Sequence, residues 1–302
     1  MTTTAPDGSP HIVVGIDGSE PSYRAAEWAA HEAARRSLPL RLVSCYSVPL
    51  AGEPGMVGTY AVEAQVDAIR NEHDRFVDTA VTRVRSAVTG LRLERLITLA
   101  SPSIVLPKNA EPGGMLVVGS TGRSGRLADV LGSVATAACH HSSVPVVVVP
   151  ATSSKRGSSM KKIVVGTDGS ESARHAVEWA YGEARLAGAE LVVVHSWEYP
   201  YPETAGDTSG MRERMRRDAQ RELDEAVSAH TARAGGEGVA LRTHLVEAPP
   251  AKALIDESEG ADLVVVGSRG RGGFASMLLG SVSRAVVQHA HCPIAVIRHP
   301  KH

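Results

Sequence analysis

Residues 13–20 of the chain read Val-Val-Gly-Ile-Asp-Gly-Ser-Glu, and residues 164–171 read Val-Val-Gly-Thr-Asp-Gly-Ser-Glu. In both places a short apolar run, which suits a strand buried on both faces, ends at Gly-x-Asp-Gly-Ser. The serine can then cap a helix whose apolar face would pack on the sheet. The repeated stretch therefore predicts that each half of the chain begins with a strand, a turn and a helix.

A glycine motif also occurs twice. It consists of Gly-Ser-x-Gly, a spacer of nine residues and Gly-Ser. The first copy spans positions 119–133, with Thr at x, and the second spans 267–281, with Arg at x. Two homologous halves are the economical explanation. Because a repeat of about 150 residues is far longer than a solenoid unit, each half should own a hydrophobic core. We expect a first domain over 1–150, a serine-rich linker over 151–159 and a second domain over 160–302.

The composition is that of an ordinary globular protein. Of 302 residues, 43% are hydrophobic and 22% are charged, and the net charge is −1. No net field would therefore draw the chain to nucleic acid or to an anionic membrane. The three cysteines form no Cys-x-x-Cys pair, and the sequence has neither a signal-peptide pattern nor an apolar run long enough to span a bilayer. We expect a cytoplasmic protein without nucleic-acid or membrane partners.

Apolar runs alternate with helical patterns in both halves. Strands are predicted at 12–16, 40–46, 93–99, 115–119 and 144–149, and at 163–167, 191–197, 241–247, 263–267 and 294–297. Strands that alternate with helices favour parallel pairing with right-handed crossovers. Each half is thus predicted to be an α/β domain whose open parallel sheet is covered by helices on both faces.

The two motifs meet at one edge of such a sheet. Ligands bind beyond the carboxyl ends of the strands, where the strand order reverses, and both Asp17 and Gly119 would lie there. Glycines at 119 and 122 would let backbone N–H groups approach a ligand and would permit positive φ. Gly132 and Ser133 would open a helix whose N-terminal N–H groups favour phosphate. Phosphates on the loop and Asp17 near a sugar or base describe a nucleotide site.

Other nucleotide motifs are absent from the sequence. It contains no Gly-x4-Gly-Lys-Ser/Thr loop, and no Gly-x-Gly-x-x-Gly follows the first strand. A single Gly-x-x-Gly would be interpreted as a tight turn. Two complete copies, each paired with Gly-x-Asp, favour a binding site instead.

Val-Gly-x-Asp near the start and Gly-x2-Gly-x9-Gly-Ser near the end of each half resemble the universal stress protein family in its tandem two-domain form. The resemblance covers nearly the whole chain, and the glycine motif is typical of the ATP-binding branch. It implies five parallel strands per domain in the order 3-2-1-4-5, with an adenine nucleotide where the order reverses. ATP is the implied ligand, with ADP or AMP as alternatives, and Mg²⁺ would accompany it.

The resemblance also implies the residues of each site. The aspartate would contact the adenosine portion, backbone at the end of the second strand would meet adenine, and the glycine motif would hold ribose and phosphates. In the first half these positions are Gly15, Asp17, Ser44, Cys45, Gly119, Gly122, Gly132, Ser133 and Val134. In the second half they are Gly166, Asp168, His195, Ser196, Gly267, Arg269, Gly270, Gly280, Ser281, Val282 and Ser283. No catalytic residue and no metal ligand is assigned.

The two halves are unequal matches to the family. Ser283 supplies a hydroxyl where the first half has Ala135, and Pro107 interrupts the helix before the fourth strand. We therefore expect the first domain to be the less regular one and the weaker binder. Arg123, Arg269 and Arg271 lie within the glycine loops, where they either neutralise phosphate or remain solvated.

A regulatory protein that binds ATP and acts in the stress response, through nucleotide-dependent conformation or a protein partner, is the leading interpretation. A slow ATPase, and a scaffold with structural nucleotide or none, are the alternatives. Phosphoryl transfer needs a placed nucleophile, metal ligands and charge stabilisation. The resemblance further implies association through last strands, so we expect the two halves to pair through residues 146–149 and 294–297, and a homodimer is a further possibility.

Overall fold

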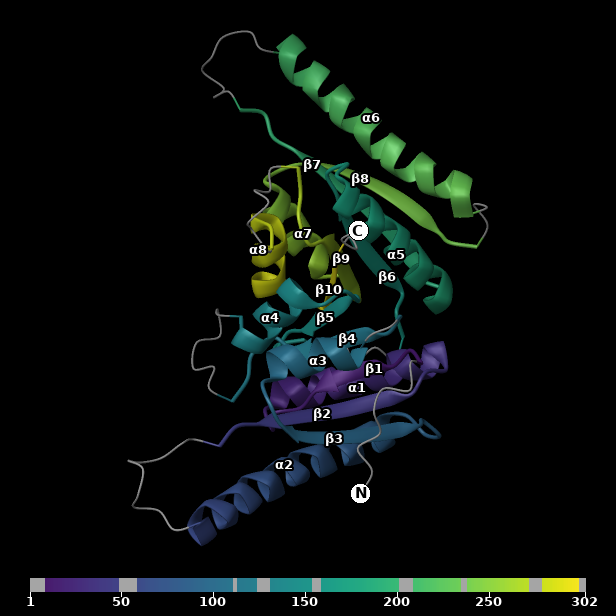
Figure 1. Cartoon of the computed structure of the whole chain (residues 1–302). Coiled ribbons are helices and arrows are strands. Elements are labelled where there is room, and N and C mark those ends of the chain that lie inside the picture. The colour runs from purple at the N-terminus through teal and green to yellow at the C-terminus, as the bar shows by residue number, and fades with distance from the viewer. Residues whose placement is uncertain are drawn as a thin grey trace. The chain divides into compact units, whose positions relative to one another are not determined.

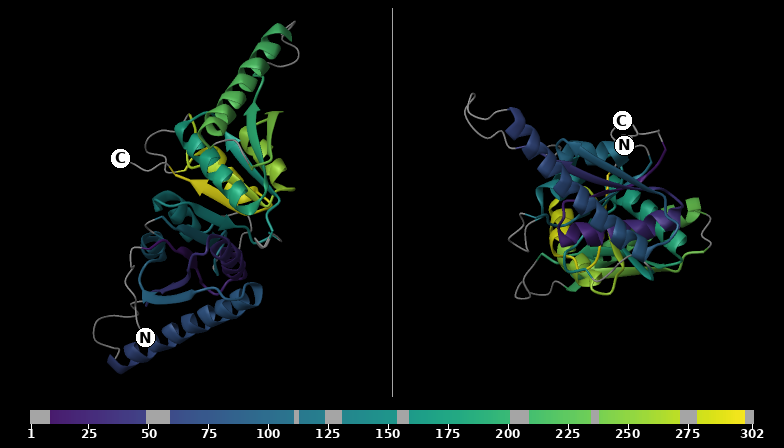
Figure 2. Two further views of the ribbon diagram at one scale, coloured as in Figure 1. Left: turned by 90° about the vertical axis from the view of Figure 1, so that its right-hand side faces the viewer. Right: turned by 90° about the horizontal axis from the view of Figure 1, so that it is seen from below.

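The computed structural model describes residues 9–48, 59–110, 113–123, 131–153, 159–200, 209–234, 238–271 and 279–298. The chain divides into two compact units, Met1–Ala151 and Thr152–His302. Figures 1 and 2 show the elements of each unit from three directions.

Each unit repeats the same element order. The first contains β1 (Ile12–Gly15), α1 (Glu20–Arg36), β2 (Leu40–Tyr46), α2 (Thr59–Ala87), β3 (Leu93–Leu99), α3 (Pro102–Ala110), β4 (Met115–Gly119), α4 (Ser133–His141) and β5 (Val146–Val149). The second contains β6 (Lys162–Thr167), α5 (Glu171–Ala187), β7 (Glu190–Trp197), α6 (Ser209–Ala234), β8 (Leu241–Glu247), α7 (Pro250–Ser258), β9 (Leu263–Gly267), α8 (Ser281–His289) and β10 (Ile294–Ile297).

All strand pairs within a unit are parallel. The order is β3-β2-β1-β4-β5 in the first unit and β8-β7-β6-β9-β10 in the second, which confirms the predicted order 3-2-1-4-5. The order reverses between β1 and β4, and between β6 and β9. At that point the chain leaves the two neighbouring strands toward opposite faces of the sheet. This leaves room for a ligand at the carboxyl ends of those strands.

Helices cover both faces of each sheet (Figure 1). Helix α1 packs against α2, and α3 packs against α4, with the same pairing of α5 with α6 and of α7 with α8 in the second unit. Right-handed crossovers place the two pairs on opposite faces. The central strands are consequently buried on both sides, as Ile12, Val13 and Val14 show with no exposed surface.

The first turn after β1 and β6 forms as predicted. Ser19 caps α1 by accepting a hydrogen bond from the Ser22 N–H at 3.3 Å, and Ser170 caps α5 by accepting from the Ala173 N–H at 3.2 Å. Pro107 differs from expectation, because α3 is one continuous helix through this residue, which is buried. A proline removes one N–H from the ladder, and here the packing of α3 keeps the remaining turns helical.

Within the part of the chain that the structure describes, no helix combines the length and the apolar composition that crossing a bilayer requires.

Candidate functional site

The first unit has a cavity of about 780 Å³ at the carboxyl ends of β1 and β4. The turn after β1, the glycine loop after β4 and the first turn of α4 surround it. Eight of the residues predicted for this site line the cavity: Gly15, Asp17, Cys45, Gly119, Gly122, Gly132, Ser133 and Val134. The first predicted site is thus assembled around one space.

The second unit has a cavity of about 360 Å³ in the matching place. Its lining includes Gly166, Asp168, Ser196, Gly267, Arg269, Gly270, Gly280, Ser281, Val282 and Ser283. Arg271 also lines it, and the guanidinium of this residue lies where a Cβ on Gly169 would be.

The motif aspartate joins the two loops of each site. In the first unit, Asp17 Oδ1 accepts hydrogen bonds from the N–H and the hydroxyl of Ser19 at 3.0 and 2.6 Å, and Oδ2 accepts from the Arg123 N–H at 3.2 Å. In the second, Asp168 accepts from the N–H groups of Ser170 and Arg271 at 3.0 and 2.9 Å. The carboxylate therefore fixes the glycine loop against the turn that follows the first strand.

The motif glycines are needed for space and not for positive φ. A Cβ on Gly122 would lie 2.7 Å from Asp17 Oδ2, and one on Gly270 would lie 2.5 Å from Asp168 Oδ2. Neither residue has a positive φ, and Gly119 does not either, so that part of the sequence expectation is wrong. The close approach of loop backbone to carboxylate explains the glycine, because any side chain would push the two apart.

Helices α4 and α8 begin at the cavities without a side-chain cap. Their N-cap residues are Gly132 and Gly280, whose own N–H groups donate to the carbonyls of Ser120 and Ser268 at 2.8 Å. The N–H groups of the first helical turn thus receive no capping oxygen from the N-cap residue. Together with the positive end of the helix dipole, they make each cavity attractive to an anion.

Two predicted residues, Ser44 and His195, do not line the cavities. The Ser44 hydroxyl donates to the Ile16 carbonyl at 2.7 Å, and His195 Nδ1 donates to the Thr167 carbonyl at 2.8 Å. Side chains alternate along a strand, so the next residues, Cys45 and Ser196, line the cavities instead. Ser44 and His195 are buried on the other side of their strands.

Each unit places an imidazole beside the end of its second strand, but different elements supply it, and His73 also lines the first cavity. In the first unit His73 of α2 donates from Nδ1 to the Ser44 hydroxyl at 2.7 Å. In the second unit β7 supplies His195, and α6 places the fully buried Leu223 at the position that matches His73. Burial lowers the pKa of His73; the carboxylates of Glu72 and Asp17 oppose that effect, and Arg123 adds to it.

The structure adds a cavity wall that the motifs did not predict. Helix α3 contributes Pro102 and Leu106, and α7 contributes the matching Pro250 and Leu254. A Cβ on Gly15 would lie 3.0 Å from Leu106, and one on Gly166 would lie 2.7 Å from Leu254. The repeated Pro-x3-Leu at the start of a helix that leaves the same sheet edge was the available signal.

Ser283 is committed to a structural contact. Its hydroxyl donates to the Gly267 carbonyl at 2.7 Å and is buried, so it ties α8 to the end of β9. Ala135, at the matching position of the first unit, provides no such bond. The second unit therefore has a side-chain hydrogen bond here that the first unit lacks the hydroxyl to form.

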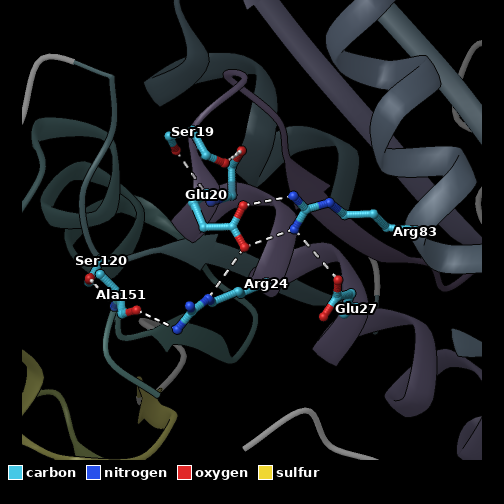
Figure 3. A network of polar contacts seen from close by, with 8 residues as sticks. Ser19, Glu20, Arg24, Glu27, Arg83, Ser120 and Ala151 are labelled. Atoms are coloured by element: carbon cyan, nitrogen blue, oxygen red, sulfur yellow. Dashed lines mark hydrogen bonds and ion pairs between the residues drawn. The ribbon is translucent and has the colours of Figure 1, made fainter. Parts of the chain in front are cut away.

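Figure 3 shows the polar network beside the first cavity. The Glu20 carboxylate binds Arg83 of α2 through two hydrogen bonds of 2.8 and 2.7 Å, and it pairs with Arg24 at 3.5 Å. Arg24 donates to the Ala151 carbonyl at 2.6 Å, and the Ala151 N–H donates to the Ser120 hydroxyl at 3.2 Å. The hydrogen bonds to Arg83 are the main cause that lowers the pKa of Glu20. The network holds α1, α2 and the glycine loop together.

Burial raises the pKa of the Cys45 thiol to about 11, so this cavity residue is a neutral thiol at neutral pH. Among the described residues, no group of three or more His, Cys, Asp or Glu side chains is placed to hold a metal ion. The cavities thus offer glycine backbone, a helix terminus, arginine and one aspartate each.

Comparison with known proteins identifies the fold and the repeat. The model of the universal stress protein family matches residues 9–150 and again 160–298. A universal stress protein of Mycolicibacterium smegmatis is 32% identical over 291 residues, covering 95% of this chain and 96% of that protein. The universal stress protein Rv1996 of Mycobacterium tuberculosis is 33% identical over 315 residues, covering 96% and 95%.

A solved structure shares the whole two-unit chain. A universal stress protein from Archaeoglobus fulgidus aligns with a TM-score of 0.66 at 21% identity, covering 96% of this chain and 97% of that one. Two copies of the family in one polypeptide, each with the parallel sheet described above, agree with these matches. The chain therefore belongs to the universal stress protein family, in the tandem two-domain form.

Proposed function

We propose that each unit binds an adenine nucleotide in its cavity, with ATP as the leading ligand and ADP or AMP as alternatives. The observation that carries the proposal is the convergence, in both units, of a bare glycine loop, a helix start with a glycine N-cap and an aspartate on one cavity. Cavities that bind small molecules have volumes of about 300–1,000 Å³, and both cavities fall in that range.

The phosphate end of the ligand fits the glycine loop. Gly122 and Gly270 present backbone beside the cavity where a side chain would collide, and α4 and α8 point their positive ends at the same space. Arg123 lines the first cavity, and Arg269 and Arg271 line the second, where their charge suits a polyphosphate. Mg²⁺ would arrive bound to the phosphates.

We expect the nucleoside end of the ligand to contact the apolar part of the cavity wall. In the first unit Val43, Leu106 and the thiol of Cys45 offer an apolar wall for a purine, and Val194 and Leu254 do so in the second. An ionised aspartate accepts hydrogen bonds only, which suits the hydroxyl donors of a ribose. Asp17 and Asp168 both line their cavities.

The biological role is proposed from family membership. Nucleotide binding would change the conformation of the protein, or its affinity for a protein partner, during the stress response. We place this activity in the cytoplasm, where ATP is abundant. Among the described residues, Cys45, Cys139 and Cys292 form no disulfide, which suits a reducing compartment.

The test is to denature freshly purified protein and to identify the released small molecules by chromatography with mass detection, quantified per chain. Adenine nucleotide near one or two equivalents is expected. The Gly122→Ala/Gly270→Ala double variant, purified in the same way, is expected to release little. If wild type releases none and takes up none after incubation with ATP and Mg²⁺, the proposal fails and a scaffold without nucleotide is the better interpretation.

A further inference from the structure

Each glycine loop carries an arginine directly after its second glycine. The backbone N–H groups of Arg123 and Arg271 donate to Asp17 and Asp168, which fixes the base of each side chain at the edge of the cavity. Both arginines line their cavities. The backbone of each arginine is therefore held in place, while the position of its guanidinium depends on which charged groups lie within reach.

The charged ends bind matching glutamates on the long helices. Arg123 Nη2 lies 3.0 Å from Glu72 Oε1 of α2. Arg271 Nη2 lies 2.9 Å from Glu222 Oε2 of α6, and its Nη1 donates to Glu222 Oε1 at 3.3 Å. The same bridge between loop and helix thus occurs in both units, although the two loops differ at several other positions.

These ion pairs are open to solvent. The side chains of Arg123 and Glu72 are 50% and 43% exposed, and those of Arg271 and Glu222 are 55% and 36% exposed. Solvent screens such pairs, so they are weak and exchange partners easily. A polyphosphate carries several charged oxygens and accepts charge-assisted, bidentate hydrogen bonds from a guanidinium. It is the stronger competitor for an arginine that already lines the cavity.

We propose that Arg123 and Arg271 exchange partners when a nucleoside polyphosphate binds: each arginine breaks its ion pair with Glu72 or Glu222 and binds the phosphates instead. The inference rests on the proposed function and adds to it a ligand discrimination, because adenosine has no group that can take the arginine. It also adds a mechanical consequence. The exchange breaks the bridge between the glycine loop and the long helix of the same unit.

The released glutamates then act on neighbouring histidines. Glu222 Oε2 lies 3.6 Å from His195 Nε2, so loss of Arg271 leaves this carboxylate to the imidazole. Glu72 precedes His73, whose bond to Ser44 joins α2 to β2. Phosphate binding at the loop thereby reaches the contact between helix and sheet in each unit.

The experiment compares ATP and adenosine affinities by isothermal titration calorimetry on the full chain. Arg123→Gln/Arg271→Gln should lower the ratio of ATP to adenosine affinity about tenfold, because one charge-assisted hydrogen-bonding group per site is lost. Glu72→Gln/Glu222→Gln should raise ATP affinity about twofold to fivefold, which is the strength of an exposed ion pair. Arg221→Gln and Glu213→Gln make the same charge changes in an exposed part of α6 and should leave both affinities unchanged.

A variant with all four substitutions distinguishes partner exchange by the arginines from simple repulsion between the glutamates and the phosphates. If each glutamate competes for its arginine, the gain from Glu72→Gln/Glu222→Gln disappears once both arginines are glutamine. A gain that persists in that background would mean that the glutamates only repel phosphate, and the exchange would be wrong. ATP binding that survives Arg123→Gln/Arg271→Gln unchanged would also overturn it while leaving the proposed function intact. A wild type that binds neither ATP nor adenosine would remove the proposed function and the exchange together.

Discussion

At the scale of single residues, Asp17 and Asp168 serve the structure before any ligand binds. Each carboxylate accepts N–H groups from two separate loops, which brings the glycine loop to the end of the first strand. The same oxygen that meets the loop excludes a Cβ at Gly122 or Gly270. Aspartate and glycine are therefore one paired requirement, and the spacing of the motif follows from their contact.

Alanine at Gly122 or Gly270 is the smallest change that breaks this contact. A methyl group 2.5 to 2.7 Å from the aspartate oxygen must push the loop away. We expect Gly122→Ala and Gly270→Ala each to weaken nucleotide binding in their unit by about tenfold or more, because phosphate donors lose their positions. Calorimetry with ATP measures this. Gly182→Ala, within α5 and with open space around its Cβ, is the control and should instead raise stability by about 0.5–1 kcal/mol.

Replacing the aspartate should affect stability as well as binding. Asp17→Ala leaves the N–H and the hydroxyl of Ser19 and the N–H of Arg123 without their acceptor, which should cost about 1–3 kcal/mol of unfolding free energy. Asp168→Ala removes two such bonds and should cost less. Urea unfolding of both variants, without nucleotide, makes the comparison. Equal stability of Asp17→Ala and wild type would mean that water replaces the carboxylate.

The sequence predicted most of the cavity residues, but it did not predict the direction of every side chain. The motif glycines and Asp17 could be placed because strand ends of one sheet share an edge. The prediction for Ser44 and His195 concerns their backbone and stays a prediction; their side chains do not line the cavities, because one residue of register along a strand turns a side chain to the other face. His73 could not be found, because its position depends on how α2 packs across β2.

At the scale of elements, the internal repeat supported the prediction of the strands and helices. Comparison of the halves gave the strands, the helices and their parallel pairing, because each pattern was seen twice, whereas the strand order came from the resemblance to the family. Pro107 shows the limit of local rules. A proline is expected to interrupt a helix, but α3 is short, packs on the sheet and stays helical through it. Tertiary packing outweighed the local preference there.

An ion pair between β2 and β3 should make the stability of the first unit depend on pH. Arg41 donates to Glu94 Oε2 at 2.9 and 2.7 Å, and His11 lies 3.2 Å from the same oxygen. Burial acts to raise the pKa of Glu94, but the hydrogen bonds and charges of Arg41 and His11 outweigh it and hold the pKa below its ordinary value. A carboxyl with a lowered folded pKa contributes stability above its unfolded pKa, and this is lost as the pH falls through the folded pKa.

We therefore expect the unfolding free energy to fall as the pH drops below about 4.3, the ordinary value for glutamate, and Glu94→Gln to flatten that part of the profile. Urea unfolding at several pH values between neutral and acid gives the profile. Glu63→Gln, an exposed change on α2, is the control and should follow wild type. A Glu94→Gln profile parallel to wild type would show that the pair contributes nothing.

At the scale of the whole molecule, one chain contains two cavities of different volume and different bracing. Ser283 ties α8 to β9, and Arg269 stands where the first loop has Thr121. We expect two equivalents of ATP per chain with separate affinities, the weaker lost in Asp17→Ala and the tighter lost in Asp168→Ala. Calorimetric titration of the two variants tests this. Retention of the tighter site by Asp168→Ala would reverse the assignment.

The two origins of the imidazole have a consequence for how the repeat can change over time. A recombination event that copied α2 into the second half would put the polar ring of a histidine in place of the fully buried Leu223. The reverse copy would leave the Ser44 hydroxyl facing Leu223 and without its imidazole partner. We therefore expect exchange of that segment between the duplicated halves to cost stability in either direction, which would keep the two copies from becoming identical.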